Sequence, residues 1–228
     1  MTPLVLIPGM MCDARMWGVV PAALGPRPMH HALPVMGETI AQMAEAILQD
    51  APAEFALAGL SMGGIVAMEM LRQAPARITR LALLDTNPLP EVPAVRARRA
   101  PQIARVLAGD LDSVMQDELK PNYLADPSDR TILDLCLDMA RKLGPDVFRR
   151  QSLALMNRVD QTDILRRFTG PALVLMGAQD RLCPRDRHEL MHNLMPQSEL
   201  IIIADAGHLP PLEQPAPTIA AFKTWLQQ

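Results

Sequence analysis

Short, wholly apolar runs alternate with segments of helical periodicity over most of this chain, and no other feature restricts its fold as strongly. Residues 1–86 predict strands and helices in turn, and the same alternation resumes at Pro171. Strands that are apolar on both faces are typical of a parallel sheet with helices on both sides. We therefore expect an α/β fold with about six parallel strands.

The boundaries of these elements follow from periodicity and from capping residues. The expected strands are residues 4–7, 30–35, 55–60 and 81–85, a strand from residue 171, and residues 200–203. The expected helices are residues 14–24 with Asp13 as cap, 40–49 with Thr39 as cap, 62–73, 184–194 and 218–228.

Between residues 87 and 169 the strand pattern gives way to helical periodicity. Prolines interrupt the chain between residues 88 and 93, and helices are expected at 94–108, 111–119, 127–143 and 146–158. Asp126 is expected to cap the third helix, and Gly144-Pro145 to end it. Because amphipathic helices must bury their apolar faces, residues 1–86 and 170–228 are expected to form the core, and residues 87–169 a helical cap, or lid.

The pentapeptide Gly59-Leu60-Ser61-Met62-Gly63 places a serine where an apolar strand turns into a helix. Such a turn strains the serine backbone, points its Oγ out of the sheet and favours small residues two positions before and after it. Ser61 is thus the expected nucleophile, and the Met62 N–H, at the positive end of a helix, an expected oxyanion donor. An ordinary helix N-cap is the alternative role for Ser61.

A base and an acid follow in the order that this motif requires, serine, then acid, then histidine. Asp180 comes just after the strand that starts at residue 171, and His208 just after the strand at 200–203. Asp85, at the end of another expected strand, is the alternative acid, and Asp205 a weaker third candidate. The other histidines, at positions 30, 31, 188 and 192, are not expected to serve Ser61.

On residues 59–64, 177–180, and 207–208 followed by 213–215, the chain resembles the α/β-hydrolase superfamily nearly from end to end. The resemblance implies the α/β-hydrolase fold, without the two strands that usually come first, and a helical cap over the active site. A second oxyanion donor is expected in the loop after the first strand, where Met10 N–H is the best candidate and Met11 N–H the next. Pro8-Gly9 stands there in place of the His-Gly of many relatives.

Sixteen methionines accompany an aromatic content of only 3%. Flexible thioethers adapt to irregular apolar shapes, so some methionines are expected to line a pocket for an apolar group, although filling the core is the alternative for each. The pocket candidates are Met11, Met115, Met139 and Met156. Three arginines of the insertion, Arg96, Arg98 and Arg99, are interpreted as a solvated helix face.

The composition narrows the class of partner. A net charge of -3 gives no excess of positive charge that would attract nucleic acid or an anionic membrane. The three cysteines, Cys12, Cys136 and Cys183, form neither a disulfide framework nor a metal set, and Cys12 is interpreted as a small buried residue. We expect a soluble cytoplasmic protein that acts on a small molecule without a metal or other cofactor. Its oligomeric state is left open.

These residues predict a serine hydrolase that cleaves an ester or thioester of a small, largely apolar substrate. His208 would take the proton of Ser61, Asp180 would fix the imidazole tautomer, and water would release the acyl-enzyme. The resemblance also implies lactone, carbon–carbon and peracid chemistry, since this fold supports many reactions. An alternative of another class is a ligand receptor or signalling protein with little turnover.

Overall fold

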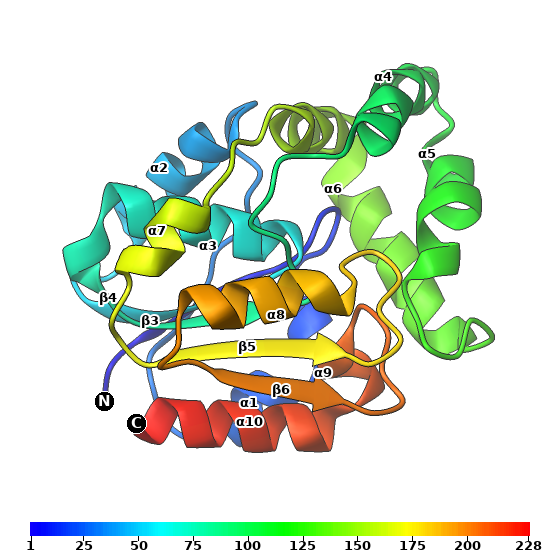
Figure 1. Ribbon diagram of the computed structural model, residues 1–228. Coiled ribbons are helices and arrows are strands. Elements are labelled where there is room, and N and C mark those ends of the chain that lie inside the picture. The colour runs from blue at the N-terminus through cyan, green and yellow to red at the C-terminus, as the bar shows by residue number, and fades with distance from the viewer.

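The computed structural model describes all 228 residues, and its centre is a single six-stranded sheet (Figure 1). The strand order is β2-β1-β3-β4-β5-β6, and every neighbouring pair is parallel. The strands are β1 (Leu4–Ile7), β2 (Met29–His31), β3 (Phe55–Leu60), β4 (Ile78–Leu84), β5 (Ala172–Gly177) and β6 (Glu199–Ile203). The expected parallel α/β sheet is confirmed.

Helices connect the strands. Those outside the region between β4 and β5 are η1 (Ala14–Trp17), α1 (Val20–Ala23), α2 (Ile40–Asp50), α3 (Met62–Gln73), η2 (Pro75–Arg77), α8 (Arg185–Leu194), α9 (Pro210–Glu213) and α10 (Pro215–Gln227). Those between β4 and β5 are α4 (Pro93–Leu107), α5 (Leu111–Ser113), η3 (Val114–Leu119), η4 (Lys120–Asn122), α6 (Arg130–Met156) and α7 (Thr162–Arg167). None of them combines the length and apolar character needed to cross a membrane.

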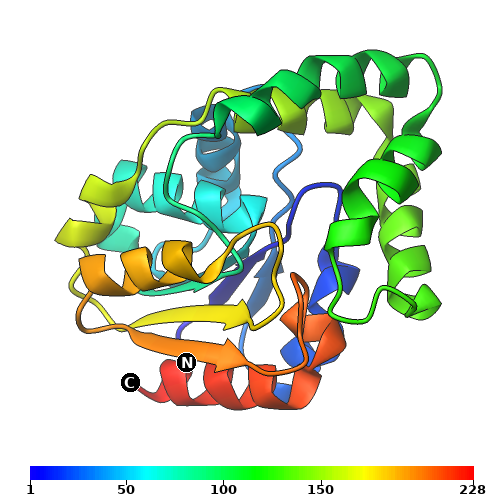
Figure 2. The same ribbon diagram turned by 45° about the vertical axis from the view of Figure 1, so that its right-hand side comes forward.

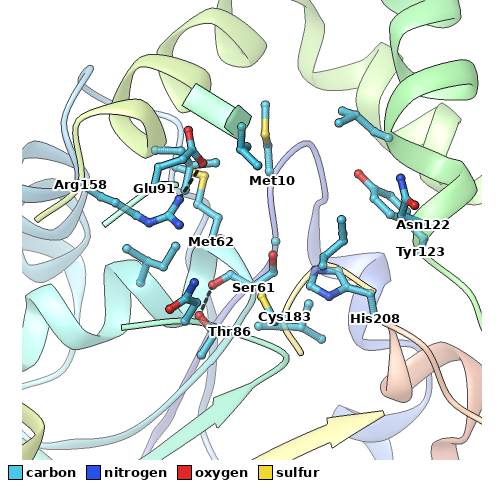
Figure 3. A pocket seen from close by; sticks show the side chains of 18 of the residues that line it. Met10, Ser61, Met62, Thr86, Glu91, Asn122, Tyr123, Arg158, Cys183 and His208 are labelled. Carbon is cyan, nitrogen blue, oxygen red and sulfur yellow. Dashed lines mark hydrogen bonds and ion pairs between the residues drawn. The ribbon is translucent and has the colours of Figure 1, made fainter. Parts of the chain in front are cut away.

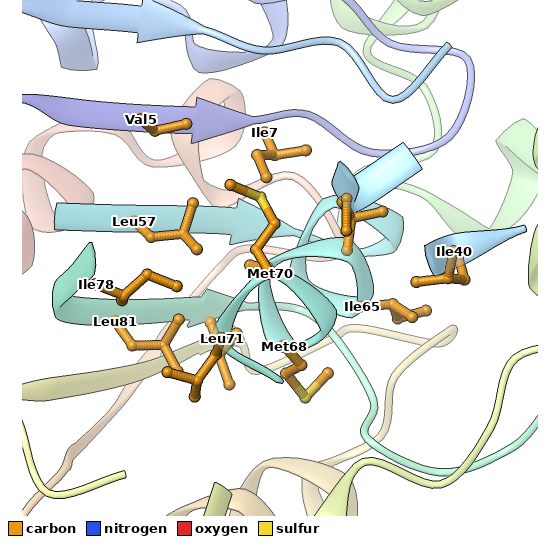
Figure 4. Packing of buried hydrophobic residues seen from close by; sticks show 14 of the residues in the cluster. Val5, Ile7, Ile40, Leu57, Ile65, Met68, Met70, Leu71, Ile78 and Leu81 are labelled. Atoms are coloured by element: carbon orange, nitrogen blue, oxygen red, sulfur yellow. The ribbon is translucent and has the colours of Figure 1, made fainter. Parts of the chain in front are cut away.

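Each face of the sheet is covered by its own hydrophobic core. Helices α2 and α3 pack on one face, where Met68, Met70 and Leu71 of α3 join strand residues such as Leu57 and Leu81 (Figure 4). Helices η1, α1 and α10 cover the other face, where Trp17 of η1 packs edge to face on Phe222, and Phe222 on Trp225. Because both faces are covered, the central strands are apolar, as the sequence predicted, except at Thr79 and Arg80 near the start of β4.

The topology fixes where a ligand can bind. Strand β1 lies between β2 and β3, so the chain leaves β1 in one direction and later returns to its other side. In open α/β sheets, the carboxyl ends of the strands at such a switch point form the binding crevice. Met10 follows β1 there and Ser61 follows β3.

The insertion, residues 87–169, lies with its helices α4, α5 and α6 beyond the carboxyl ends of the strands, whereas α7 lies near the start of β5 (Figures 1 and 2). Its two long helices are α4 and α6, which pack on each other. Helix α6 is broken at Gly144, whose φ of 81° is not helical, and this break falls at the predicted helix end. Helix α7, which the sequence pattern did not predict, packs instead on α3 and α8.

Three local predictions were wrong. The helix expected at 14–24 is split into η1 and α1, because Gly18 adopts a φ of 52°. The strand expected at 30–35 ends at His31. Asp129, rather than Asp126, caps α6, since the Asp126 carboxylate accepts hydrogen bonds from the Ser128 N–H and hydroxyl.

Candidate active site

Ser61 occupies the sharp turn between β3 and α3. Its φ of 55° and ψ of -118° lie in a region that L-residues rarely adopt. It stands in the N-cap position, but its side chain makes no capping hydrogen bond. The turn is so tight that a Cβ on Gly59 would lie 2.2 Å from the Gly63 carbonyl oxygen. Only glycine fits there, as the sequence predicted.

Asp180 and His208 form a buried pair at the ends of β5 and β6. Both carboxylate oxygens of Asp180 lie 3.0 Å from Nδ1 of His208. Asp180 also accepts hydrogen bonds from the N–H groups of Leu182 and Cys183. Burial alone would raise the pKa of the Asp180 carboxyl, but His208 and these N–H groups outweigh it and hold the pKa below its usual value.

The other two carboxylates considered as the acid do not contact His208. Asp85 is fully buried, and one of its oxygens accepts a hydrogen bond from the Gly177 N–H at 2.9 Å. Burial raises the pKa of the Asp85 carboxyl well above its usual range, and the nearby Asp180 charge adds to the shift. Asp205 is exposed.

His188 lies close to this pair, nearer to the site than the sequence suggested. Its Nε2 accepts a hydrogen bond from the Thr86 N–H at 3.3 Å, and the Thr86 hydroxyl donates to the Ser61 carbonyl at 2.6 Å (Figure 3). Burial lowers the pKa of His188 to about 4. A neutral His188 therefore supports the backbone of the serine turn through Thr86.

Two backbone N–H groups near Ser61, those of Met62 and Met10, have no hydrogen-bond acceptor within the protein. The Met62 N–H opens α3, where an N–H has no acceptor earlier in its own helix. The β1 loop approaches closely, since a Cβ on Gly9 would lie 3.4 Å from the Ser61 Cβ. The Met10 N–H in that loop donates to no protein group. The next N–H, of Met11, donates to the Gln151 side chain at 2.8 Å and is thus occupied.

The loop that carries His208 is held in place by Glu213, a residue of the predicted motif for which the sequence indicated no role. One Glu213 oxygen accepts from the N–H groups of Gly207 and Ala125, and the other from Leu209. The His208 N–H itself donates to the Tyr123 carbonyl at 2.6 Å. The insertion, through residues 123–125, therefore helps to hold the histidine loop.

A cavity of about 390 Å³ opens between the core and the insertion. Ser61, Met62, Met10 and His208 line it from the core, and Figure 3 shows them around one space. The insertion contributes about half of the wall, including Val95, Leu119, Asn122, Tyr123 and Leu155. No hydrogen bond joins the Ser61 hydroxyl to a protein group in this structure.

The four methionines predicted to line the pocket do not line this cavity, so that prediction was wrong. Met11 and Met115 are buried in the insertion's own hydrophobic cluster. Met139 is buried against the core, where its sulfur accepts a hydrogen bond from the Asp13 N–H. Met156 ends α6, and its carbonyl accepts from Arg96. Their side chains fill the interior or, for Met156, lie outside the cavity.

One of the three arginines assigned to a solvated face is buried instead. Arg99 is 8% exposed and lines the cavity, where it pairs with Glu91. Arg158 pairs with the same carboxylate. No sequence signal marks this cluster, because the two arginines lie 8 and 67 residues from Glu91 and meet it only through the fold.

Two groups of possible metal ligands occur here, and both contain Asp180. The first adds Cys183 and His208, and the second adds Asp85 and His188. Both Asp180 oxygens already contact His208 Nδ1, and burial raises the pKa of the Cys183 thiol, which disfavours the thiolate that binds metals. The geometry favours an acid–histidine pair over a metal centre.

A family model described as "Alpha/beta hydrolase family" matches residues 4–221. The chain belongs to this family. The superfamily resemblance, the fold and the assignment as a hydrolase are thereby confirmed.

Relatives of this α/β hydrolase carry names of esterases. The chain is 27% identical to a pimeloyl-(acyl-carrier protein) methyl ester esterase of Aromatoleum aromaticum, over 93% of each chain. It is 25% identical to one of Klebsiella pneumoniae, over 93% of this chain and 89% of the relative. A malate-bound thermophilic esterase from Thermogutta terrifontis is similar over 100% of this chain and 90% of its own, with a TM-score of 0.89 and 28% identity.

Proposed function

We propose that this α/β hydrolase is a serine esterase in which Ser61 is the nucleophile, His208 the general base and Asp180 the residue that orients it. The observation that carries the proposal is the Asp180–His208 pair, because a carboxylate on Nδ1 leaves Nε2 as the free basic nitrogen. That imidazole lines the same cavity as the strained Ser61. Proximity of this kind is what activates a weak serine nucleophile.

The reaction then proceeds by acyl transfer. Nε2 of His208 takes the Ser61 proton as Oγ attacks the ester carbonyl, and Asp180 stabilises the imidazolium. The negative charge on the tetrahedral carbonyl oxygen is bound by the N–H groups of Met10 and Met62. His208 returns its proton to the departing alcohol, and a water molecule, activated in the same way, hydrolyses the acyl-enzyme. Catalytic hydrogen bonds are often long or poorly aligned in ligand-free sites and tighten only when substrate binds, so the free Ser61 hydroxyl does not argue against this role.

The substrate is an ester or thioester of small size. A cavity of about 390 Å³ is of the order that encloses small ligands, and apolar side chains such as Ile65, Leu119 and Leu155 line it. The names of the relatives support ester cleavage. In this proposal the insertion, residues 87–169, acts as the cap that excludes water from the reacting groups.

Labelling with a fluorophosphonate tests the nucleophile. The wild-type protein should react at Ser61 and hydrolyse short-chain p-nitrophenyl esters. Ser61→Ala should lose labelling and on the order of 10³ or more in kcat, with an unchanged circular dichroism spectrum. Ser128→Ala, an exposed hydroxyl in the insertion, is the control and should behave as wild type. Ligand binding without labelling or turnover would instead identify a receptor.

A further inference from the structure

Two arginines converge on one glutamate in the wall of the cavity. Glu91 lies in the segment before α4, Arg99 on α4 and Arg158 just after α6. Arg99 donates two hydrogen bonds to the Glu91 carboxylate, from Nε to Oε2 at 2.9 Å and from Nη2 to Oε1 at 2.7 Å. Arg158 Nη1 donates to the same Oε1 at 2.8 Å. The side chains are only 3% exposed for Glu91 and 10% for each arginine.

The cluster carries one more positive charge than it can neutralise. Burial alone would raise the pKa of Glu91, but the two arginines hold it below its usual value, so the carboxylate is ionised. An arginine stays protonated in proteins, and one would suffice to pair with Glu91. An uncompensated buried charge is costly. We therefore expect the charge of the second guanidinium to be balanced by a bound anion that is not part of the chain.

Unused hydrogen-bond donors of the cluster are available to such an anion. Arg99 Nη1 contacts only the Met10 sulfur, at 3.4 Å, and a thioether is a weak acceptor. Arg158 donates through Nε to the Leu89 carbonyl and through Nη1 to Glu91, while its Nη2 has no acceptor. Both arginines line the cavity that contains Ser61.

The position of the cluster indicates which part of the substrate it would bind. In Figure 3, Arg158 and Glu91 lie across the cavity from His208, on the side of Met62. The leaving alcohol must depart near His208, because this residue gives it a proton. The acyl part then extends toward the arginines. Apolar residues of that wall, such as Ile65 and Leu155, would contact its methylene groups.

We propose that Arg99 and Arg158, held by Glu91, form a subsite for a carboxylate at the far end of the acyl chain. The preferred substrate is then a half-ester of a short dicarboxylic acid. Its hydrolysis consumes one water and yields the alcohol, the dicarboxylate and one proton. The inference rests on the proposed esterase function, and it adds the charge and the class of the acyl group.

Matched esters separate this subsite from general esterase activity. Monomethyl and dimethyl esters of succinate, glutarate and adipate share their chains but differ in the terminal charge. For wild type, kcat/KM should be at least roughly tenfold higher for the half-ester of the best-fitting length. In Arg158→Gln this half-ester to diester ratio should fall by roughly 10- to 100-fold, the usual effect of losing a charged hydrogen bond. Arg158→Lys should restore part of it.

Arg141→Gln is the matched control. Arg141 also pairs with a carboxylate, that of Asp112, but it is exposed and lies outside the cavity. The variant should keep the wild-type ratio. If Arg158→Gln also keeps this ratio and only lowers the thermal midpoint, the cluster merely anchors the insertion, and the subsite is refuted.

A binding measurement distinguishes failure of the subsite from failure of the esterase proposal. Calorimetry with glutarate needs no turnover and can use Ser61→Ala as background, where Arg158→Gln should weaken Kd by roughly tenfold or more. Binding that is lost in Arg158→Gln supports the subsite even if no ester is cleaved. The subsite is refuted if glutarate does not bind, or if it binds equally well with and without Arg158→Gln. Tighter binding of glycerol phosphate than of glutarate would also refute it and would assign the site to phosphate.

Discussion

The core and the insertion position their side chains by different physical means. In the core, backbone segments touch directly at glycines: a Cβ on Gly177 would lie 1.9 Å from the Gly207 carbonyl oxygen, and a Cβ on Gly63 2.1 Å from that of Ile7. These contacts join the ends of β1, β3, β5 and β6. In the insertion, charged side chains connect the helices, as in the pairs that Asp112 and Glu118 form with arginines.

This difference in packing suggests that the residues of the core are held more rigidly than the residues of the insertion that line the cavity. Where backbone segments pack this closely, a side chain larger than that of glycine does not fit. Exposed ion pairs are screened by water, so each of them contributes little to the stability of the fold. The core can thus hold Ser61 and His208 in place while residues of the insertion change the shape of the cavity. The regions meet at the histidine loop, through Tyr123 and Glu213. Substitutions on each side of this boundary can test the contrast.

The largest effect is expected for the acid of the core. Asp180→Asn preserves shape but puts an amide against His208 Nδ1, which favours the wrong imidazole tautomer. Ester hydrolysis should fall by roughly 10³- to 10⁴-fold, the loss expected if Asp180 orients His208 as proposed. Asp205→Asn, an exposed position with a φ of 55° that asparagine tolerates, is the control and should retain wild-type kcat. Equal activity in both variants would remove Asp180 from the mechanism.

A pair of truncations in the insertion tests which residues shape the cavity. Met139 is fully buried against the core, so Met139→Ala should lower the free energy of unfolding by about 2–5 kcal/mol. Its chain-length preference should stay that of wild type. Leu119 lines the cavity, and Leu119→Ala should shift the preference to longer acyl chains. Urea unfolding measures the stability, and a series of p-nitrophenyl esters measures the chain-length preference. A shifted preference in Met139→Ala would show that residues outside the cavity wall also determine its shape.

A smaller effect is expected at the boundary. In Glu213→Gln one carboxylate oxygen becomes a carbonyl oxygen and the other is replaced by an NH₂ group. The NH₂ group cannot accept a hydrogen bond, so at least one backbone N–H of the loop loses its acceptor. An unsatisfied buried donor costs about 1–3 kcal/mol, so the thermal midpoint should drop and kcat should fall by roughly tenfold as the His208 loop loosens. Glu199→Gln, an exposed substitution at the start of β6, serves as control. Unchanged kcat in Glu213→Gln would show that the loop is held by other contacts.

The sequence predicted the core well because local patterns determine it. Strands β1 and β3 and helix α3 have the bounds expected from their apolar runs, and the glycines flanking Ser61 reflect a steric demand. Asp180 and Asp85 both fit the chain order of the motif, but the strand before Asp180 was expected beside the strand that carries His208; β5 does pair with β6, and Asp180 contacts His208. Apart from this strand adjacency, the signals lie within a few residues of the groups that they concern.

The wall of the cavity could not be predicted in the same way. Helical periodicity gives the apolar face of a helix but not whether that face meets the core, another helix or a ligand. Met139 and Leu119 are both apolar residues of the insertion, yet only Leu119 reaches the cavity. Arg99 was assigned to solvent because charged residues are usually exposed. Its burial depends on Glu91 and Arg158, which tertiary structure brings to it.

The mildest test concerns Asp85, a core carboxyl that contacts neither His208 nor the cavity. Its pKa is raised in the folded protein, so folding is favoured most below the usual aspartate pKa of about 4, and that stability is lost as the pH rises toward the folded pKa. An asparagine at this position would not ionise, and its carbonyl could still accept the Gly177 N–H. Asp85→Asn should therefore gain stability relative to wild type as the pH rises from about 4 to about 7 in urea unfolding. A difference that stays constant over this range would mean that Asp85 is ionised in the folded core, where Asp180 would then lie beside a second buried negative charge.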